Sequence, residues 1–205
     1  MKKVLSYIVV YMLLLPPIFS FNGTEAQAAT NNKIMGKSTL TAQQMAVFVK
    51  KKNPNNQLKG ISVEELAETY LEEGKIEGVK GDVAFAQALK ETGYFTYGGD
   101  VKPDQHNYAG IGTTHKGIKG HYFETPAEGV RVQIQHLKAY SSKAKLNNPL
   151  IDPRFKYVKR GSAKTWSQLH GKWAMQRGGN YGEDILSIYK EMSKVSVINI
   201  AAVEK

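Results

Sequence analysis

The sequence predicts a single, mainly α-helical domain with a glycine-rich insert in its middle. Apolar residues recur at helical spacing in several segments, and capping signals precede them. Glycines cluster between residues 93 and 124, where the helical spacing stops. The 205-residue chain contains neither an internal repeat nor a low-complexity linker. A chain of this length, without the N-terminal segment described in the next paragraph, suits one domain with its own core.

The first 28 residues have the three parts of a secretory signal peptide. Residues 1–3 are a cationic start, residues 4–21 are almost wholly apolar, and residues 26–28 give a small-x-small cleavage site. A membrane anchor is the alternative interpretation. The apolar run is at the lower edge of the length that spans a bilayer, and Pro16 and Pro17 interrupt it. We therefore expect cleavage, export and no stable membrane insertion.

The composition indicates which partners the exported chain can have. The chain has 28 basic and 18 acidic residues, no cysteine and a formal net charge of +10. Without disulfides, an exported protein must be stable by packing alone. Such a protein meets few nucleic acids, so anionic polymers of the cell envelope are the expected partners of its charge. A solvated basic surface without any partner explains the charge equally well.

Two short amphipathic helices are expected before the glycine-rich insert. Capping boxes begin them, formed by Thr41 with Gln44 and by Ser62 with Glu65. Apolar residues follow each box at helical spacing, and Pro54 lies where the first helix must stop. The sequence therefore predicts a pair of helices joined by a short link.

A third helix is expected from about Asp82 to Thr92. Asp82 suits its beginning, by capping and by its charge against the helix dipole. Phe85 and Leu89 belong to its core stripe, and Gly93 suits its end. Residues beyond it, up to 124, are typical of loops with a short hairpin, and so long a connection inside a compact domain is usually functional.

Helical structure is expected again after the insert. Thr125 is the predicted cap, and Glu128 completes its capping box. A short helix is expected around residues 165–170, and a last helix from about Glu183. Residues 196–205 are expected to form a C-terminal tail.

Elimination leaves carboxyl groups as the candidates for chemistry. The five histidines form no close His-x-x-x-His pair, so no metal site is predicted, although His115 and His121 share one loop segment. The absence of cysteine excludes a thiol enzyme, and there is no Gly-x-Ser-x-Gly motif.

Glu91 is the most informative carboxyl group, because it lies at the end of the third expected helix. Apolar neighbours and the negative end of the helix dipole would both raise its pKa. A glutamic acid that stays protonated near neutral pH can act as the general acid for a glycosidic oxygen. From these residues alone, an ordinary exposed glutamate at a helix end is the simpler interpretation.

A family resemblance favours the catalytic interpretation. Residues 81–95 resemble the catalytic helix of the glucosaminidase family of peptidoglycan hydrolases (glycoside hydrolase family 73), whose motif reads roughly Ala-Gln-x-x-x-Glu-Thr/Ser-Gly. Further segments resemble, in order, the family's Asn-Phe-x-Gly loop, the next helix, two segments typical of a Gram-positive branch and the late Asn-Tyr segment: residues 107–112, 123–140, 152–155, 160–163 and 180–183. The resemblance covers roughly residues 34–195.

The resemblance implies a lysozyme-like helical fold with a small, glycine-rich, β-containing lobe over residues 34–195. It implies a secreted, cell-wall-associated monomer without a cofactor. Its activity would be that of an endo-β-N-acetylglucosaminidase, which hydrolyses the β-1,4 bond between N-acetylglucosamine and N-acetylmuramic acid in peptidoglycan. Glu91 would be the general acid. A lytic transglycosylase of the same fold and a non-catalytic wall-binding protein are the competing interpretations.

The resemblance also implies roles for further residues. Glu124 would be the second catalytic group, with Asp100 and Asp104 as runners-up, unless the substrate's own acetamido group takes that role. Tyr181 would lie beside Glu91 and orient water or the acetamido group. The residues expected to line the sugar groove are Asn107, Tyr108, Gly110 and Gly112.

Overall fold

The computed structural model describes residues 32–114, 116–173 and 179–196. The predicted signal peptide, residues 1–28, lies outside this part of the chain, as does all but the first residue of the predicted tail, 196–205. None of the helices in the described ranges is both long and apolar enough to cross a bilayer.

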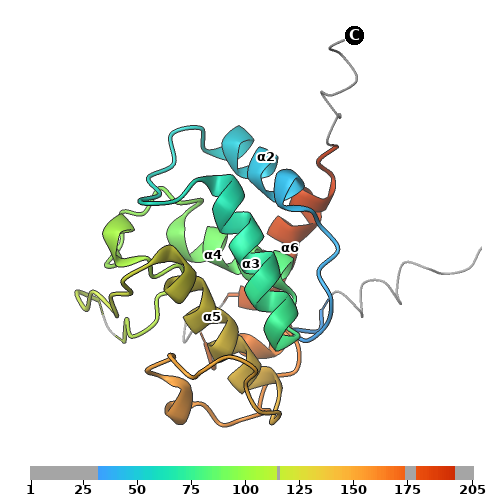
Figure 1. Ribbon diagram of the computed structural model, residues 1–205, viewed down its shortest axis with the longest axis vertical. Coiled ribbons are helices and arrows are strands. Elements are labelled where there is room, and N and C mark those ends of the chain that lie inside the picture. Colours follow the sequence, from blue (N-terminus) through green and yellow to red (C-terminus); the bar gives the residue numbers. More distant parts are fainter. Residues whose placement is uncertain (1–31, 115, 174–178, 197–205) are drawn as a thin grey trace, which may run out of the picture.

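The described chain is mainly helical, as the sequence predicts (Figure 1). Two isolated β-bridges, which join Lys33 to Thr165 and Met35 to Val79, lie outside the glycine-rich lobe. The α-helices are α2 (Ala42–Lys52), α3 (Val63–Glu77), α4 (Gly81–Thr92), α5 (Pro126–Ser141) and α6 (Tyr181–Ser193), with short 3₁₀ helices at η1 (Pro103–Gln105), η2 (Phe155–Tyr157) and η3 (Ser167–Leu169).

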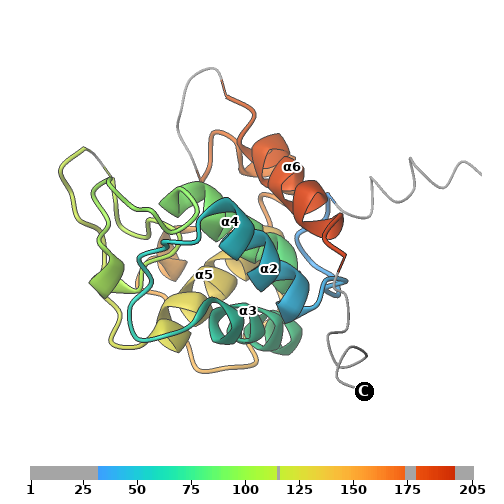
Figure 2. The ribbon, with the colours of Figure 1, turned by 90° about the horizontal axis from the view of Figure 1, so that it is seen from above.

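Helix α4 lies at the centre of the molecule. It packs against α3, α5 and α6, and α2 packs across α3 and α6 (Figure 2). Every residue from Gly81 to Leu89 is buried. A helix that is buried all round needs apolar residues on all its faces, and α4 has them on most. Because the rest of α4 is enclosed, any group that this helix offers to solvent must lie at its exposed end.

Local capping explains where α2 and α3 begin. The Thr41 hydroxyl accepts a hydrogen bond from the Gln44 backbone N–H at 3.2 Å, and the Gln44 side chain accepts one from the Thr41 backbone N–H at 3.0 Å. Ser62 and Glu65 make the same reciprocal pair at the start of α3. Both capping boxes are confirmed, because each depends only on residues within one turn.

The beginning of α4 differs from the prediction. The N-cap is Lys80, whereas Asp82 lies in the first turn, where its charge faces the helix dipole as predicted and Oδ1 accepts from the Val83 N–H at 2.9 Å. Oδ2 of Asp82 accepts hydrogen bonds from the backbone N–H groups of Thr39 (2.7 Å) and Leu40 (3.2 Å). Asp82 therefore fixes the segment that enters α2. The helix begins at Gly81, and a Cβ there would lie 2.0 Å from the Tyr70 carbonyl oxygen, so only glycine permits this approach of α3 to α4.

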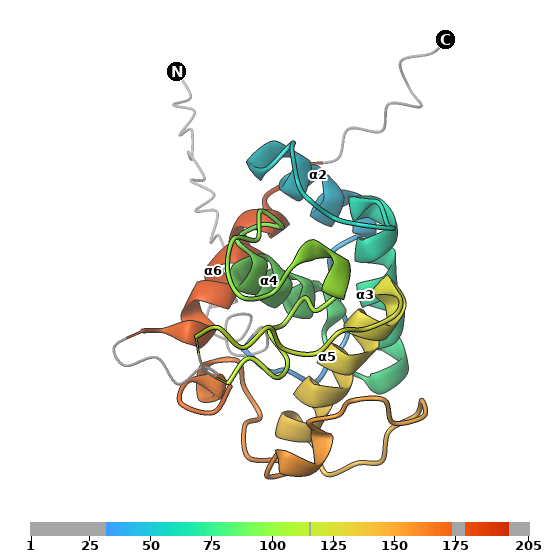
Figure 3. The ribbon, with the colours of Figure 1, turned by 90° about the vertical axis from the view of Figure 1, so that its left-hand side faces the viewer.

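The lobe between α4 and α5 forms turns and the η1 helix within its described residues, not the expected hairpin (Figure 3). Side-chain amides replace much of the ladder that a hairpin would need. Gln105 Nε2 donates to the Lys119 carbonyl at 2.7 Å, and Asn107 Nδ2 donates to the carbonyls of Ile111 and His121 at 2.9 and 3.0 Å. Backbone N–H groups of His121 and Phe123 also donate across the lobe, to the carbonyls of Ile111 (2.8 Å) and Gln105 (3.0 Å), so the lobe is held by scattered bonds rather than by a regular ladder.

The later elements are close to their predicted positions. Thr125 caps α5, but the Glu128 carboxylate accepts from the backbone N–H of Glu124 at 3.0 Å, so the expected box is shifted by one residue. The short helix near residues 165–170 is the 3₁₀ helix η3, and α6 begins at Tyr181, two residues before the predicted start.

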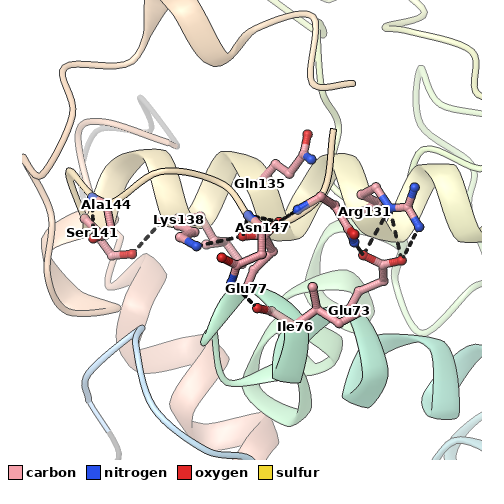
Figure 4. A network of polar contacts seen from close by, with 12 residues as sticks. Glu73, Ile76, Glu77, Arg131, Gln135, Lys138, Ser141, Ala144 and Asn147 are labelled. Atoms are coloured by element: carbon pink, nitrogen blue, oxygen red, sulfur yellow. Dashed lines mark hydrogen bonds and ion pairs between the residues drawn. The ribbon is translucent and has the colours of Figure 1, made fainter. Parts of the chain in front are cut away.

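A buried polar network joins α3 to α5 (Figure 4). Lys138 Nζ lies 2.7 Å from Glu77 Oε2, with side chains only 4% and 0% exposed. Arg131, two turns before Lys138 on α5, pairs at 2.7 Å with Glu73, which is one turn before Glu77 on α3. Burial raises the pKa of Glu77, but the Lys138 ammonium and two backbone N–H groups outweigh this and hold the pKa below its usual value. The network therefore favours the charged form of Glu77.

Candidate active site

A pocket of about 210 Å³ opens at the end of α4, between that helix and the lobe. Residues 81–89 of α4 are buried, Lys90 is half-buried, and the helix emerges at Glu91. The pocket is lined by Glu91, Thr92, Gly93, Tyr97, Gly99, Asp100, Val101, Asn107, Gly110 and Thr113. The structure thus places Glu91 at the wall of a cleft, with only part of the side chain open to solvent.

Burial raises the pKa of Glu91 above its ordinary value. The side chain is surrounded by protein on most sides, although the residue as a whole is exposed toward the pocket. A hydrogen bond donated by the Tyr181 hydroxyl to Glu91 Oε1 lowers the pKa, and so does the charge of Lys90, but burial outweighs both. The result is a carboxyl group that keeps its proton to a higher pH and remains accessible.

A chain of buried hydrogen bonds leads through the core to Glu91. The Tyr70 hydroxyl donates to Gln133 Oε1 at 2.5 Å, and Gln133 Nε2 donates to Gln87 Oε1 at 2.9 Å. Gln87 Nε2 then donates to the Tyr181 hydroxyl at 2.8 Å, and Tyr181 donates to Glu91. Every bond points the same way, toward the carboxyl group. The chain fixes Tyr181 as a donor to Glu91.

Sequence reasoning missed the part that Gln87 plays in this chain. Gln87 and Glu91 are four residues apart on α4, so they lie on one face of the helix. The spacing was the available signal, because a buried glutamine one turn before a catalytic candidate needs a polar partner. Its other partners come from α5 and α6, which spacing along the chain cannot reveal.

The backbone just after α4 is strained. Tyr94, Phe95 and Tyr97 have φ values of 57°, 60° and 57°, in the left-handed region that non-glycine residues avoid. Each such residue costs on the order of 1–3 kcal/mol, and the surrounding structure must hold it in place. Phe95 is fully buried against Phe85 and Tyr108, which anchors this turn. The tight turn brings Tyr97 into the pocket wall.

Gly110 is the predicted groove residue that comes nearest to the acid. Its φ is +63°, and a Cβ there would lie 3.0 Å from Thr113 Oγ1 and 3.9 Å from Glu91 Oε2. Asn107 also lines the pocket, but both polar atoms of its side-chain amide bond within the lobe, Nδ2 as a donor and Oδ1 as the acceptor of the Ile111 N–H at 2.8 Å. Asn107 thus shapes the loop that holds Gly110. Gly112 lines a second, neighbouring pocket instead.

Tyr108 does not lie in the groove, contrary to the prediction. It is 1% exposed, and its ring packs edge-on against Tyr70 and Phe95 in the core. The loop reaches this depth because residue 129 of α5 is a glycine. A Cβ at Gly129 would lie 1.8 Å from the His106 carbonyl oxygen, so a side chain there would exclude the loop. A sugar could not contact the Tyr108 ring in this arrangement.

The three candidates for a second carboxyl group are placed differently. Asp100 lines the pocket with Glu91, and its Oδ1 accepts a hydrogen bond from the Gly117 N–H at 3.0 Å. Glu124 and Asp104 are exposed and are not among the residues that line this pocket. Of the three candidates, Asp100 is the one that shares the pocket with Glu91.

A metal site and a wider cavity are the alternatives to this pocket. No group of three or more metal-ligating side chains occurs among residues 32–114, 116–173 and 179–196; His115 lies outside these ranges. A wider cavity of about 650 Å³ lies between residues 36–40 and α3, but none of its lining residues carries a carboxyl group. The pocket at Glu91 is therefore the candidate active site.

The fold and the site define a small helical protein whose central helix presents, in a cleft, a carboxyl group with a raised pKa. The glucosaminidase family model, described as mannosyl-glycoprotein endo-beta-N-acetylglucosaminidase, matches residues 67–194. This match covers more than half of the chain, so the protein belongs to the glucosaminidase family. Helix α2 precedes the matched range but contributes Met45 and Phe48 to the same core.

One similar protein comes from Borreliella burgdorferi and is described as uncharacterized. It is 48% identical over 115 residues, which is 56% of this chain and 56% of that protein. The chain thus matches little more than half the length of this relative. No solved structure matches the chain.

Proposed function

We propose that this protein is an exported endo-β-N-acetylglucosaminidase that hydrolyses the β-1,4 bond between N-acetylglucosamine and N-acetylmuramic acid in peptidoglycan. The observation that carries the proposal is Glu91, a carboxyl group with a raised pKa that is open to a pocket. Membership of the glucosaminidase family supports the same class of reaction. Residues 1–28 and the positive charge support export and retention in an anionic cell wall.

In the proposed reaction, Glu91 protonates the glycosidic oxygen as the sugar becomes oxocarbenium-like. Oε1 already accepts a hydrogen bond from Tyr181, so the transferable proton is on Oε2, the oxygen nearest Gly110. When the proton leaves, the Tyr181 bond gains a charged acceptor and becomes stronger. Tyr181 thus stabilises the carboxylate formed by the transfer more than the neutral acid that precedes it, and such differential stabilisation is what catalysis requires.

We propose Asp100 as the second catalytic group. It shares the pocket with Glu91, where it would accept a proton from the attacking water or stabilise the positive sugar. Glu124 remains the prediction from the family resemblance. Asp100→Asn and Glu124→Gln, assayed side by side, distinguish the two, since only the catalytic carboxylate lowers the rate when neutralised. If neither does, the substrate's acetamido group takes this role.

Clearing of purified cell walls tests the proposed function. Glu91→Gln is expected to fold and to lose at least about a hundredfold in rate, the usual scale for a general acid. Glu68→Gln on α3, an exposed glutamate, is the matched control and keeps full activity. Full activity of Glu91→Gln contradicts the assignment.

Mass spectrometry of the digested wall distinguishes the competing reactions. New N-acetylglucosamine reducing ends support the proposal, whereas 1,6-anhydro-muramic ends indicate a lytic transglycosylase. Binding to walls without any release of sugar indicates a non-catalytic wall-binding protein. The three outcomes exclude one another for a pure preparation.

A further inference from the structure

A second pocket adjoins the first on the other side of the Gly110 loop. It has a volume of about 250 Å³, and we call it the Trp173 pocket. It shares Gly110 and Thr113 with the pocket at Glu91, so a single ligand can lie along both. Residues 109–114 form one wall, and the opposite wall is formed by His136, Tyr140, Arg154, Lys172 and Trp173.

The rings in this wall hold one another in place. His136 lies edge-on to Trp173, with ring centroids 4.9 Å apart, and Tyr140 lies 6.0 Å from Trp173. His136 Nδ1 is 2.7 Å from Asp152 Oδ2, and the Asp152 side chain is fully buried. The buried carboxylate fixes the imidazole so that its other nitrogen, Nε2, is the one left for a ligand. The wall is therefore a preformed surface of aromatic and polar groups.

The charges on the pocket are all positive. Arg154 and Lys172 line it, and none of its lining residues is acidic. The Arg154 guanidinium lies 4.8 Å from the Tyr157 ring centre, a stacking contact that leaves its N–H groups for a ligand. Lys172 Nζ donates to the Gln168 carbonyl at 3.0 Å, which uses one of its three protons. These groups suit a carboxylate, and the aromatic rings suit the face of a sugar.

We propose that the Trp173 pocket binds the carboxylate carried by the muramic acid side of the substrate, next to the bond that Glu91 cleaves. This inference rests on the proposed function. A carboxylate there comes either from the lactyl group of the sugar or from the peptide attached to it. Arg154 is the recognising residue, with Lys172 beside it, and Trp173 packs on the sugar. The pocket thus gives the cleft a preference for anionic amino sugars over neutral ones.

Binding of small sugars to the full chain tests the inference, with the indole signals in NMR as the readout. The chain has only two tryptophans, and Trp166 is fully buried, so the Trp173 signal is readily assigned. The probes are N-acetylmuramic acid, its neutral methyl ester, and muramyl dipeptide, whose carboxylate is on the peptide. None of these contains the bond that Glu91 is proposed to cleave.

We expect N-acetylmuramic acid or muramyl dipeptide to shift the Trp173 signal and to leave that of Trp166 unchanged. The better of the two identifies the source of the carboxylate. The methyl ester binds at least about tenfold more weakly, because a hydrogen bond to a charged group is lost. Arg154→Gln weakens binding of the acid to the level of the ester, whereas Lys145→Gln, at an exposed lysine, removes the same charge without effect.

Equal binding of acid and ester, with no tighter binding of muramyl dipeptide, overturns the inference, and so does unchanged binding of the tighter ligand by both Arg154→Gln and Lys172→Gln. Failure of the inference and failure of the proposed function are distinguishable. A protein that cuts walls but binds neither anionic probe more tightly than the neutral ester retains the function and loses the Trp173 pocket. A protein that binds the acid at Trp173 but releases no sugar from walls retains the pocket and loses the function.

Discussion

Replacing Tyr181 by phenylalanine removes one oxygen atom at the centre of the proposed mechanism. The ring is 5% exposed and is retained, but its hydroxyl no longer accepts from Gln87 Nε2 or donates to Glu91 Oε1. Leaving the buried Gln87 donor without a partner costs about 1–3 kcal/mol. In a domain of this size that lowers Tm by about 2–12 °C, since each kcal/mol corresponds to about 2–4 °C.

The same change predicts a defined shift in the pH dependence of the rate. Activity requires protonated Glu91 and is lost as pH rises through the pKa of that carboxyl group. The Tyr181 hydrogen bond lowers this pKa, so without it the pKa rises and the alkaline limb moves to higher pH. The rate at the optimum falls about ten- to a hundredfold, because the carboxyl group is no longer held in its productive orientation.

Wall clearing measured from acid to alkaline pH, with Tm by calorimetry, tests both effects. Tyr189→Phe is the matched control. It lies on the same helix and also loses a buried hydroxyl contact, with Thr39 at 2.7 Å, but it does not contact Glu91. The control should lose stability without any shift of the alkaline limb. An unmoved or acid-shifted limb in Tyr181→Phe, at full rate, refutes the reasoning.

Three further predictions concern stability and the shape of the site. Burial raises the pKa of Glu91, so the stability that its carboxyl group contributes is present below the unfolded-state pKa and is lost as pH rises through the folded-state pKa. Glu91→Gln, which stays neutral, should therefore have a higher Tm than the wild type at neutral pH but not in acid. Lys138→Met leaves Glu77 buried without its cationic partner. We expect this to lower the free energy of unfolding in urea by about 3–5 kcal/mol at pH 7, and by less in acid, where Glu77 takes up a proton. An equal loss at both pH values contradicts the pairing. Gly110→Ala should cost about 1–2 kcal/mol because of its φ of +63°, and should lower the rate more than the stability, since the new methyl group lies 3.9 Å from Glu91 Oε2; an unchanged rate argues against a substrate path there.

Features that depend on neighbouring residues were predictable from the sequence. The capping boxes of α2 and α3 require only a hydroxyl and an amide or carboxylate three residues apart. Glu91 was found because the end of an amphipathic helix and a family motif coincide there. Burial then raises its pKa as expected, although the amount depends on packing by other helices.

Features that depend on distant parts of the chain were not predictable in this way. Asp82 was expected to cap its own helix but binds the segment before α2, more than 40 residues earlier in the chain. Tyr108 was expected to face a sugar, but Gly129 allows its loop to approach α5 and buries the ring. The Trp173 pocket combines residues from four separate segments, and although three of them resemble family segments, none indicates a carboxylate-binding site by itself.

The enclosure of α4 separates two kinds of mutational damage along one helix. Substitutions between Gly81 and Leu89 enter a closed interior, so they should reduce the yield of folded protein before they affect turnover. Substitutions at Glu91 should leave yield intact and abolish turnover. A deep mutational scan that records abundance and activity in parallel would show this boundary within two residues. Gln87 is the informative exception, because it is buried like the rest of residues 81–89 and is linked to Glu91 through the Tyr181 hydroxyl.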